Sequence, residues 1–130
     1  MQQATAVMVI DDLFFVAKVQ APLLSVGLTP RPVTSRAALD AYLQTAPAPA
    51  LMVVDLTLRS DDAIAMIHTL RASPHGTVVP ILAFGAHVAV DVNKQALAAG
   101  ATRVVAKSVL SGHFVELVRQ LLGQDSTPGD

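Results

Sequence analysis

Three aspartates stand where two short apolar runs end. Asp11 and Asp12 follow the run 7–10, and a third acid, Asp55, follows the run 51–54. Ligands of an open parallel sheet bind in the crevice outside the carboxyl ends of its strands, so acids at two such ends would converge. Hard divalent cations such as Mg²⁺ take oxygen ligands, among them one or two carboxylates. The three acids therefore predict a cation site at one end of a sheet.

Asp55 could also do covalent chemistry. An aspartate can act as a nucleophile toward phosphorus, and phosphoryl transfer then needs little beyond in-line positioning and neutralisation of charge. Lys107 follows a third apolar run, 104–106, and would bring a cation to the same end of the sheet. Taken singly, Asp11 and Asp12 could instead cap the next helix, where negative charge is favoured, and Lys107 could be a solvated lysine.

Apolar runs rich in β-branched residues alternate with segments of helical period along the chain. This alternation predicts a doubly wound α/β fold, in which a five-stranded parallel sheet carries helices on both faces. Near-continuous apolarity marks the first, third and fourth strands as buried, whereas the second is short and polar, as an edge strand is. The predicted strands are 6–10, 31–34, 51–55, 79–84 and 103–106.

Four helices are predicted from the apolar spacing. Residues 13–26 form the first, in which Pro22 predicts a kink or an early end, because proline removes a backbone donor and clashes with the preceding turn. Two more follow Ser35 and Ser60, the second with Asp61-Asp62 as its cap and first-turn acid, and a last one is stopped by Gly123. The apolar stripes of these three helices are Leu39, Tyr42, Leu43 and Ala46; Ala63, Met66, Ile67 and Leu70; and Leu110, Phe114, Leu117, Val118, Leu121 and Leu122.

The composition is that of one folded domain. Of 130 residues, 52% are hydrophobic and 15% charged, which predicts a domain over 1–123 and a flexible tail over 124–130. A net charge of −1 gives no basic footprint for nucleic acid. The lack of cysteine excludes disulfides and thiolate metal sites, and no stretch has the length of a membrane span or the pattern of a signal sequence. We expect a cytoplasmic protein that binds neither nucleic acid nor membrane.

The acids and the lysine together make the chain resemble a response-regulator receiver domain of the CheY-like kind. Asp11-Asp12 follow the first strand, Asp55 ends the third, and Lys107 comes directly after the fifth. The resemblance covers nearly the full length and implies a flavodoxin-like strand order 2-1-3-4-5. It implies that Asp55 accepts a phosphoryl group, that Lys107 contacts the phosphate and that Mg²⁺ is bound. The implied metal ligands are Asp11, Asp12, Asp55 and the backbone carbonyl of Thr57.

Other positions depart from the receiver pattern. Gly85 stands where receivers carry a Ser or Thr whose hydroxyl bonds the phosphate, and Val104 replaces the usual aromatic switch residue. The chain thus resembles an atypical receiver without the Thr–aromatic switch. Besides Gly85, three residues are candidate modulators of the site. Backbone N–H groups near Ala86 could bind phosphoryl oxygens, Phe14 would lie near the mouth and restrict entry, and His87 is either a phosphoryl or water contact or an exposed loop histidine.

The leading hypothesis is a stand-alone response regulator that is phosphorylated on Asp55 and is not an enzyme. The resemblance implies a histidine kinase or phosphotransfer protein as donor, a separate effector as target, and pairing of two copies through the fourth helix, fifth strand and fifth helix. The alternative is a pseudo-receiver, an interaction module regulated without phosphorylation. A Mg²⁺-dependent phosphatase with an aspartyl nucleophile fits less well, because Thr57 takes the place of its second acid. Neither a Walker A nor a G-x-G-x-x-G loop follows any strand, which argues against nucleotide binding.

Overall fold

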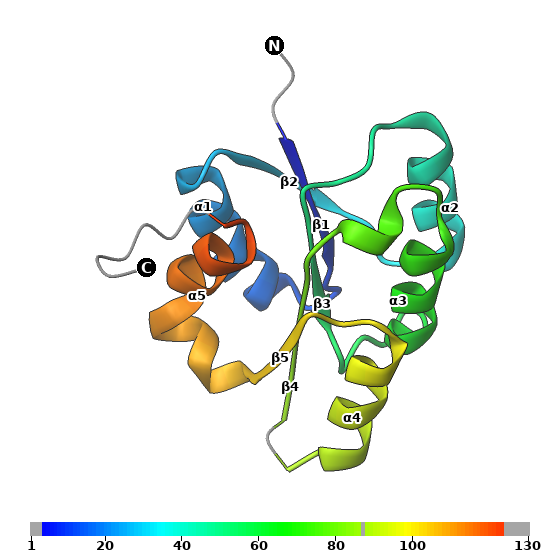
Figure 1. Ribbon diagram of the computed structural model, residues 1–130. Coiled ribbons are helices and arrows are strands. Elements are labelled where there is room, and N and C mark those ends of the chain that lie inside the picture. The colour runs from blue at the N-terminus through cyan, green and yellow to red at the C-terminus, as the bar shows by residue number, and fades with distance from the viewer. Residues whose placement is uncertain (1–3, 87, 124–130) are drawn as a thin grey trace.

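Five parallel strands form a single sheet in the computed structural model (Figure 1), which describes residues 4–86 and 88–123. The strands are β1 (Ala4–Val9), β2 (Leu28–Pro32), β3 (Leu51–Asp55), β4 (Ile81–Gly85) and β5 (Arg103–Ala106). Their order across the sheet is β2-β1-β3-β4-β5, and every neighbouring pair is parallel. The predicted fold class and the strand order 2-1-3-4-5 are confirmed.

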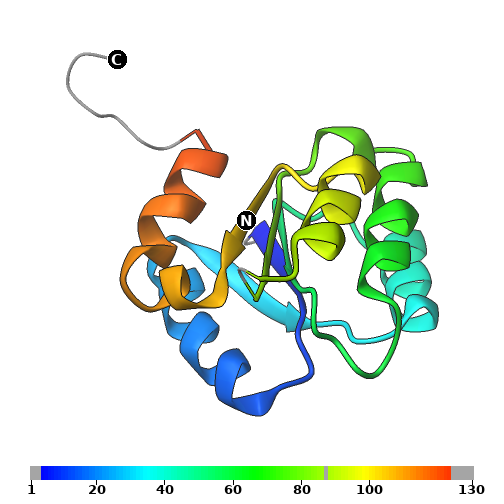
Figure 2. The ribbon, with the colours of Figure 1, turned by 90° about the horizontal axis from the view of Figure 1, so that it is seen from below.

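Helices cover both faces of this sheet. They are α1 (Leu13–Ser25), α2 (Arg36–Thr45), α3 (Ala63–Ala72), the short 3₁₀ helix η1 (Gly76–Val78), α4 (Val90–Ala99) and α5 (Lys107–Leu121). Helices α1 and α5 lie together on one face, and α2, α3 and α4 lie on the other (Figure 1). The view from below shows the same two layers of helix with the sheet between them (Figure 2).

The sheet is buried on both sides because its central strands are apolar at nearly every position. One core cluster contains Val7 and Val9 of β1 with residues of α2, α3 and α4, and a second contains Met8 and Ile10 with residues of α1 and α5. Successive strand residues point to opposite faces, so a continuous apolar run serves both clusters. All five residues of β3 and of β4 are buried, which fixes the carboxyl ends of these strands firmly in the fold.

The predicted bounds of the second strand, 31–34, were wrong. Strand β2 pairs with β1 over five positions, from Leu28 opposite Ala4 to Pro32 opposite Met8. A segment that holds two prolines is a poor strand by its local sequence. Its pairing with β1 therefore fixes a strand that the pattern placed three residues too late.

The two prolines of β2 are tolerated because the strand lies at the sheet edge. The N–H of Val33 donates to the Met8 carbonyl of β1 at 2.9 Å. Since backbone N–H groups alternate in direction along a strand, Pro30 and Pro32 occupy positions whose N–H would point away from β1. The missing donors therefore cost no ladder hydrogen bond, and they leave an outer edge that is poorly suited to adding another strand.

Other predicted bounds agree more closely. Strands β3 and β5 coincide with 51–55 and 103–106, whereas β1 covers 4–9 and β4 covers 81–85. Ser35 caps α2, as predicted, by accepting the N–H of Ala38 at 3.1 Å. Of the pair Asp61-Asp62 predicted to serve the start of α3, Asp62 is the cap, through the N–H of Ala65 at 3.1 Å.

Two helix ends differ from the prediction. Helix α1 continues through Pro22 to Ser25, so of the two predicted effects of the proline, a kink or an early end, the early end is wrong. Its buried residues Val19 and Leu23 lie on either side of the proline, and burial of an apolar face stabilises a helix more than local propensity does. Helix α5 begins at Lys107, directly after β5 and three residues before its predicted apolar stripe.

Arg71, near the end of α3, ties three segments of the α3–α4 side together. Its guanidinium donates to the carbonyls of Gly76 and Val79 at 2.6 and 2.7 Å, and twice to the carbonyl of Gly100 at 2.7 and 3.0 Å. Gly100 has a φ of 121°, which favours glycine, and an added Cβ would lie 2.8 Å from Arg71 atoms. Glycine here thus permits both the turn and the close approach of the guanidinium.

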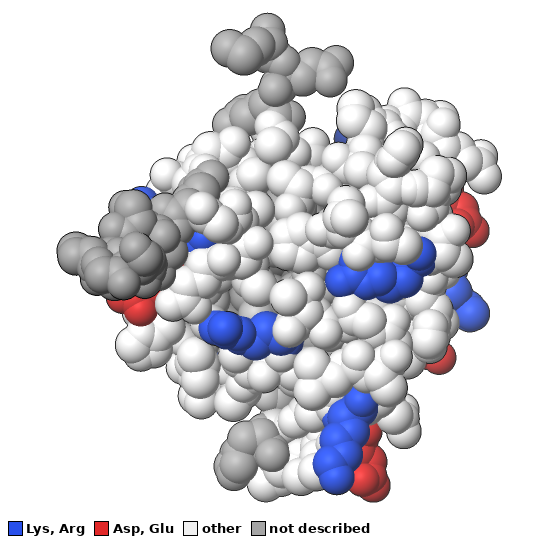
Figure 3. All heavy atoms as spheres, viewed as in Figure 1, with Lys and Arg blue, Asp and Glu red and all other residues white. Residues whose placement is uncertain are grey.

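The expected tail, 124–130, lies outside the described residues. On the face shown in Figure 3, the lysine and arginine side chains form separate patches, so this face carries no continuous basic surface. Within the described residues, no helix combines the length and apolarity needed to cross a membrane.

Candidate functional site

A pocket of about 440 Å³ lies at the carboxyl ends of β1, β3 and β5. The residues that line it are Asp11, Asp12, Asp55, Thr57, Arg59 and Lys107. The topology explains this gathering, because β1 and β3 are direct neighbours and all the strands are parallel. The structure therefore brings together the three acids and the lysine that the sequence singled out.

Asp55 is the most enclosed of the acids, with only 1% of the residue exposed. As the last residue of β3, it is fixed by a strand that is buried along its length. Its Oδ1 accepts the backbone N–H of Thr57 at 2.8 Å and the hydroxyl of Thr57 at 2.6 Å. These hydrogen bonds engage one carboxylate oxygen, and Oδ2 receives none from the described residues.

Lys107 reaches the same carboxylate partly through Thr57. Its Nζ donates to Thr57 Oγ1 at 2.8 Å and lies 3.5 Å from Asp55 Oδ1. The Thr57 hydroxyl thus accepts from the lysine and donates to the aspartate. Placement at the first turn of α5, immediately after β5, directs Lys107 to the strand ends rather than into solvent, and its side chain is 28% exposed.

The sequence reasoning missed this role of the Thr57 side chain. The resemblance implies a part for Thr57 in the site only through its backbone carbonyl, as a metal ligand. An Asp whose side chain accepts the N–H two residues later forms a common local turn, and this spacing was the available signal. The same turn brings the hydroxyl of Thr57 onto Asp55, which a search for charged residues alone does not detect.

Asp11 and Asp12 have different partners. Asp12 caps α1, since its Oδ1 accepts the N–H of Phe14 at 2.9 Å. Asp11 instead reaches across to the β3–α3 loop, where Oδ2 accepts the N–H groups of Arg59 and Ser60, both at 2.8 Å. The helix-capping interpretation therefore holds for Asp12, and Asp11 fastens the loop that follows Asp55.

These contacts set the titration of Asp11. Burial alone would raise the pKa of its carboxyl, but hydrogen bonds from the backbone N–H groups of Arg59 and Ser60 favour the charged form more strongly. The pKa of Asp11 therefore lies below its ordinary value of 3.8. The group is a carboxylate at neutral pH and adds negative charge to the pocket.

The donor set of the pocket suits a hard cation. Three carboxylates line it together with two cationic side chains, and the described hydrogen bonds engage a single oxygen of each acid. Among the residues that the structure describes, however, no three His, Cys, Asp or Glu side chains form a group close enough to hold a metal ion as they stand. The ligand type fits Mg²⁺, and side chains would have to turn to coordinate it.

Of the β4–α4 loop, residues 86, 88 and 89 are described, and none of their side chains lines the pocket. An added Cβ at the buried Gly85 would lie 3.3 Å from Leu56 Cβ and 3.4 Å from Asn93 Oδ1. Asn93 Nδ2 donates to the Ala86 carbonyl at 3.4 Å, and its buried Oδ1 has no hydrogen-bond partner among the described residues. The predicted contact of His87 lies outside the described residues.

Phe14 is 65% exposed in the first turn of α1 and is not among the residues that line the pocket. The ammonium of Lys18 lies over its ring, 4.6 Å from the centroid. The adjacent Phe15, which the sequence does not single out, is half-buried. The centroid of its ring lies 4.7 Å from Lys107 Nζ. A restriction of entry by Phe14 stays a prediction, whereas contact with the pocket's lysine is made by Phe15.

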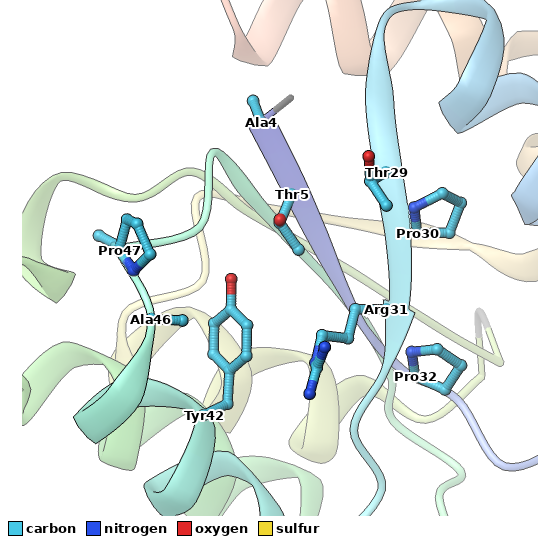
Figure 4. A pocket seen from close by; sticks show the side chains of 10 residues that line it. Ala4, Thr5, Thr29, Pro30, Arg31, Pro32, Tyr42, Ala46 and Pro47 are labelled. Atoms are coloured by element: carbon cyan, nitrogen blue, oxygen red, sulfur yellow. The ribbon is translucent and has the colours of Figure 1, made fainter. Parts of the chain in front are cut away.

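A larger pocket, of about 610 Å³, lies near the amino-terminal ends of β1 and β2 (Figure 4). Thr5 and Thr29 are opposite each other in the sheet register, and the Arg31 guanidinium lies 5.3 Å from the centroid of the Tyr42 ring. Its described lining residues include no acid, and it lies away from the three carboxylates. We therefore assign the candidate chemistry to the smaller, acidic pocket.

Solved structures share the fold over nearly the whole chain. A protein from Chloroflexus aurantiacus assigned as a response regulator has a TM-score of 0.80 and 23% identity, over 94% of this chain and 99% of that one. The phosphorylated cyanobacterial phytochrome response regulator RcpA has a TM-score of 0.79 and 16% identity, over 98% and 100%. A CheY-like receiver domain protein from Methanospirillum hungatei has a TM-score of 0.77 and 14% identity, over 95% and 96%.

The sequence itself is distant from known groups. No protein-family model matches the chain, and no curated protein matches it. At identities of 14% to 23%, the structural likeness establishes the receiver fold, and any function must be argued from the site.

Proposed function

We propose that this chain, which has the fold of CheY-like receiver domains, is a phosphorelay receiver that accepts a phosphoryl group on Asp55. The observation that carries the proposal is the buried Asp55 carboxylate with Lys107 Nζ at 3.5 Å and the Thr57 hydroxyl at 2.6 Å. A buried acid beside a cation at the end of a parallel strand suits transfer of a charged group. The donor is a histidine kinase, a phosphotransfer protein or a small phosphodonor.

The transfer follows from the two unequal oxygens of Asp55. Hydrogen bonds from Thr57 occupy Oδ1, so Oδ2 is the nucleophile. A bond forms between Oδ2 and phosphorus while the bond from phosphorus to the donor nitrogen or oxygen breaks. The donor atom keeps the electron pair and takes a proton from solvent where it needs one.

The other residues of the pocket balance charge. Lys107 is positioned to bind an equatorial phosphoryl oxygen, and Thr57 keeps the lysine beside the acid. Asp11, Asp12, Asp55 and the backbone carbonyl of Thr57 are the residues that would hold Mg²⁺, whose chemistry is to neutralise charge on the phosphoryl oxygens. Asp11, through its bonds to Arg59 and Ser60, also keeps the loop after Asp55 in place.

We propose that the signal passes to a separate effector protein in the cytoplasm, and that the chain is a signalling domain rather than an enzyme. The usual hydroxyl and aromatic positions are occupied by Gly85 and Val104, so the output differs from that of a standard receiver. Pairing of two copies through α4, β5 and α5 is part of this proposal. The charged residues on these elements include Asp91, Lys94, Arg103, Glu116 and Arg119.

A pseudo-receiver is the second candidate, and one observation favours it. Asp11 is committed to the β3–α3 loop and Asp12 to the α1 cap, and within the described chain the acids do not form a ready metal cluster. In that case the pocket would serve structure, and the protein would act through binding alone. Phosphorylation separates the two candidates.

The test is the intact mass of the chain after incubation with Mg²⁺ and acetyl phosphate. A gain of one phosphoryl group in the wild type and none in Asp55→Asn supports the receiver. Labelling that survives in Asp55→Asn overturns the assignment of the acceptor. No labelling by acetyl phosphate or by any histidine-phosphorylated donor favours the pseudo-receiver.

A further inference from the structure

Phe15 connects the acceptor pocket with another part of the molecule. Lys107 Nζ lies 4.7 Å from the centroid of the Phe15 ring. The same ammonium contacts Thr57 and Asp55. The Phe15 ring lies 5.7 Å from the ring of Phe84, which is fully buried in β4 directly before Gly85. The ring is thus fixed against the core on one side and in contact with the pocket's cation on another.

The same side chain lines a groove between α1 and α5. This groove has a volume of about 470 Å³ and is lined mainly by apolar residues. Lys18 and Glu116 are the charged residues of its described lining. Its apolar lining residues include Phe15, Val19, Pro22, Leu110, Phe114 and Val115. A shift of the Phe15 ring would therefore change the groove as well as the contact with Lys107.

An ammonium over an aromatic face is attracted to the ring, and the attraction grows as the pair is desolvated. Lys107 has two competing attractions, the ring of Phe15 and the negative charge at Asp55. Added charge on Asp55 would draw the ammonium toward the acid and away from the ring, whereas loss of that charge would release it toward the ring. The distances of 4.7 Å to the centroid and 3.5 Å to Asp55 Oδ1 place both within reach of one flexible side chain.

We propose that Phe15 is a positioning residue for Lys107 and that it couples the charge on Asp55 to the groove between α1 and α5. The proposal deepens the proposed function, since it uses phosphorylation as the natural source of added charge. It gives the chain a route from acceptor to surface that does not need a hydroxyl at Gly85 or a ring at Val104. The route leads to α1 and α5.

Among the described residues, a second cation, Lys18, and an acid, Glu116, lie near this ring or its groove. Lys18 Nζ is 5.9 Å from the Phe15 centroid and 4.6 Å from that of Phe14, so Lys18 serves mainly the exposed ring. Glu116 lies on the groove. Lys107 is the closer of the two cations to Phe15, which makes Lys18 a natural control.

Fluorine NMR of the full chain labelled with 4-fluorophenylalanine tests the coupling. The chain has four phenylalanines, Phe14, Phe15, Phe84 and Phe114, and substitution of each in turn by Leu assigns its signal. We expect Lys107→Met to shift the Phe15 signal more than any other. Lys18→Met should shift Phe14 more than Phe15.

The phosphorylation arm adds Mg²⁺ and acetyl phosphate while intact mass is followed in parallel. The expected result is a shift of the Phe15 signal in step with labelling, in the same direction as that caused by Lys107→Met, and no donor-dependent shift in Asp55→Asn. Full labelling with an unmoved Phe15 signal overturns the coupling and leaves the proposed function standing. A Phe15 signal unmoved by Lys107→Met overturns the positioning role.

Absence of labelling counts against the proposed acceptor and not against the coupling. The coupling is then decided by Asp55→Asn at rest, which removes the negative charge beside Lys107. A shifted Phe15 signal in this variant supports it, and an identical signal overturns it.

An aromatic rescue separates positioning from packing. Phe15→Leu keeps apolar volume and removes the ring face, whereas Phe15→Trp keeps the face. We expect labelling to slow on the order of two- to fivefold in Phe15→Leu and to be restored in Phe15→Trp. Equal rates in the two variants, with both folded by circular dichroism, contradict a role for the ring face.

Discussion

The hydroxyl of Thr57 lies between Lys107 and Asp55, at 2.8 Å from Lys107 Nζ and 2.6 Å from Asp55 Oδ1. The lysine is farther from the acid itself, at 3.5 Å. A neutral side chain thus mediates much of the contact between the charged groups. The arrangement keeps the ammonium beside the carboxylate while Oδ2 remains without a hydrogen bond from the described residues.

Thr57→Val tests this bridge, because it replaces the hydroxyl with a methyl of similar size. We expect the free energy of unfolding to fall by about 1–2 kcal/mol, as for loss of hydrogen bonds to charged groups. Urea unfolding at pH 7 measures the change. Thr57→Ser keeps the hydroxyl and should lose less unfolding free energy than Thr57→Val. Equal stability of the two variants would contradict a stabilising role of the hydroxyl between Lys107 and Asp55.

Lys107→Met should slow phosphorylation of Asp55 without abolishing it. Removing one hydrogen-bond donor that stabilises developing negative charge in an enzyme site costs about 10²- to 10³-fold in rate, and we expect a loss of that order here. The measurement is the rate of mass gain with acetyl phosphate, and Asp55→Asn supplies the background. Lys18→Met is the matched control, since this lysine lies over Phe14 rather than on the acid, and its rate should equal that of the wild type.

Gly85→Ser and Gly85→Ala form a pair that probes the buried Asn93. An added Cβ would lie 3.3 Å from Leu56 Cβ, so both variants strain the contact. The serine hydroxyl would also meet Asn93 Oδ1, which is buried and unpartnered within the described residues. We expect Ser to be more stable than Ala by about 1 kcal/mol in urea unfolding, the typical net value of a hydrogen bond. Equal stability would show that the hydroxyl does not reach Asn93.

The lifetime of the modification can be measured on the same two proteins after the donor is removed. We expect Gly85→Ser to change it relative to Gly85→Ala, because serine alone places a hydroxyl at the end of β4. Identical lifetimes would mean that this position no longer acts on the acceptor.

Strand ends explain why much of the site could be predicted. Asp11, Asp55 and Lys107 each stand directly after or at the end of an apolar run, and parallel strands bring such positions together. The ends of the apolar runs therefore placed the acids and the lysine at one end of the sheet. The edge strand was misplaced because the two prolines of β2 are tolerated by its pairing with β1, which no local pattern contains.

The unpredicted parts of the site depend on side-chain directions rather than on spacing. Thr57 is fifty positions from Lys107 in sequence, and Phe15 reaches the same ammonium from α1. Which rotamer brings a hydroxyl or a ring onto a cation is decided by packing between elements. Which acid of the predicted pair Asp61-Asp62 caps α3 was likewise decided by geometry, because both have the right chemistry.

Acid should remove the contribution of Asp11 to stability. Because the pKa of Asp11 is lowered in the folded protein, its contribution is fully present well above the ordinary value of 3.8 and is lost as the pH falls through that value to the depressed one. The difference in unfolding free energy between wild type and Asp11→Asn should therefore be largest near pH 7 and should shrink at pH 4 and below. Urea unfolding across this range measures it.

The pKa of Asp61 is also lowered, because the backbone N–H of Arg36 donates a hydrogen bond to its carboxylate. Asp61 is present in both the wild type and Asp11→Asn, so its pH-dependent contribution to the unfolding free energy cancels when the two are compared. A difference between wild type and Asp11→Asn that stays constant from pH 7 to pH 3 would contradict the contribution assigned to the Asp11 carboxylate.

Arg71→Met should destabilise the fold without touching the acceptor pocket. The substitution leaves the carbonyls of Gly76, Val79 and Gly100 without the guanidinium that binds them, and unpartnered buried carbonyls each cost about 1–3 kcal/mol. Since Arg71 is half-buried and water can reach some of these groups, we expect a total loss of about 2–4 kcal/mol in urea unfolding. Arg71→Lys should recover little, because one ammonium cannot reproduce the planar fork that serves three carbonyls. Full recovery by Lys would show that charge rather than geometry holds these segments together.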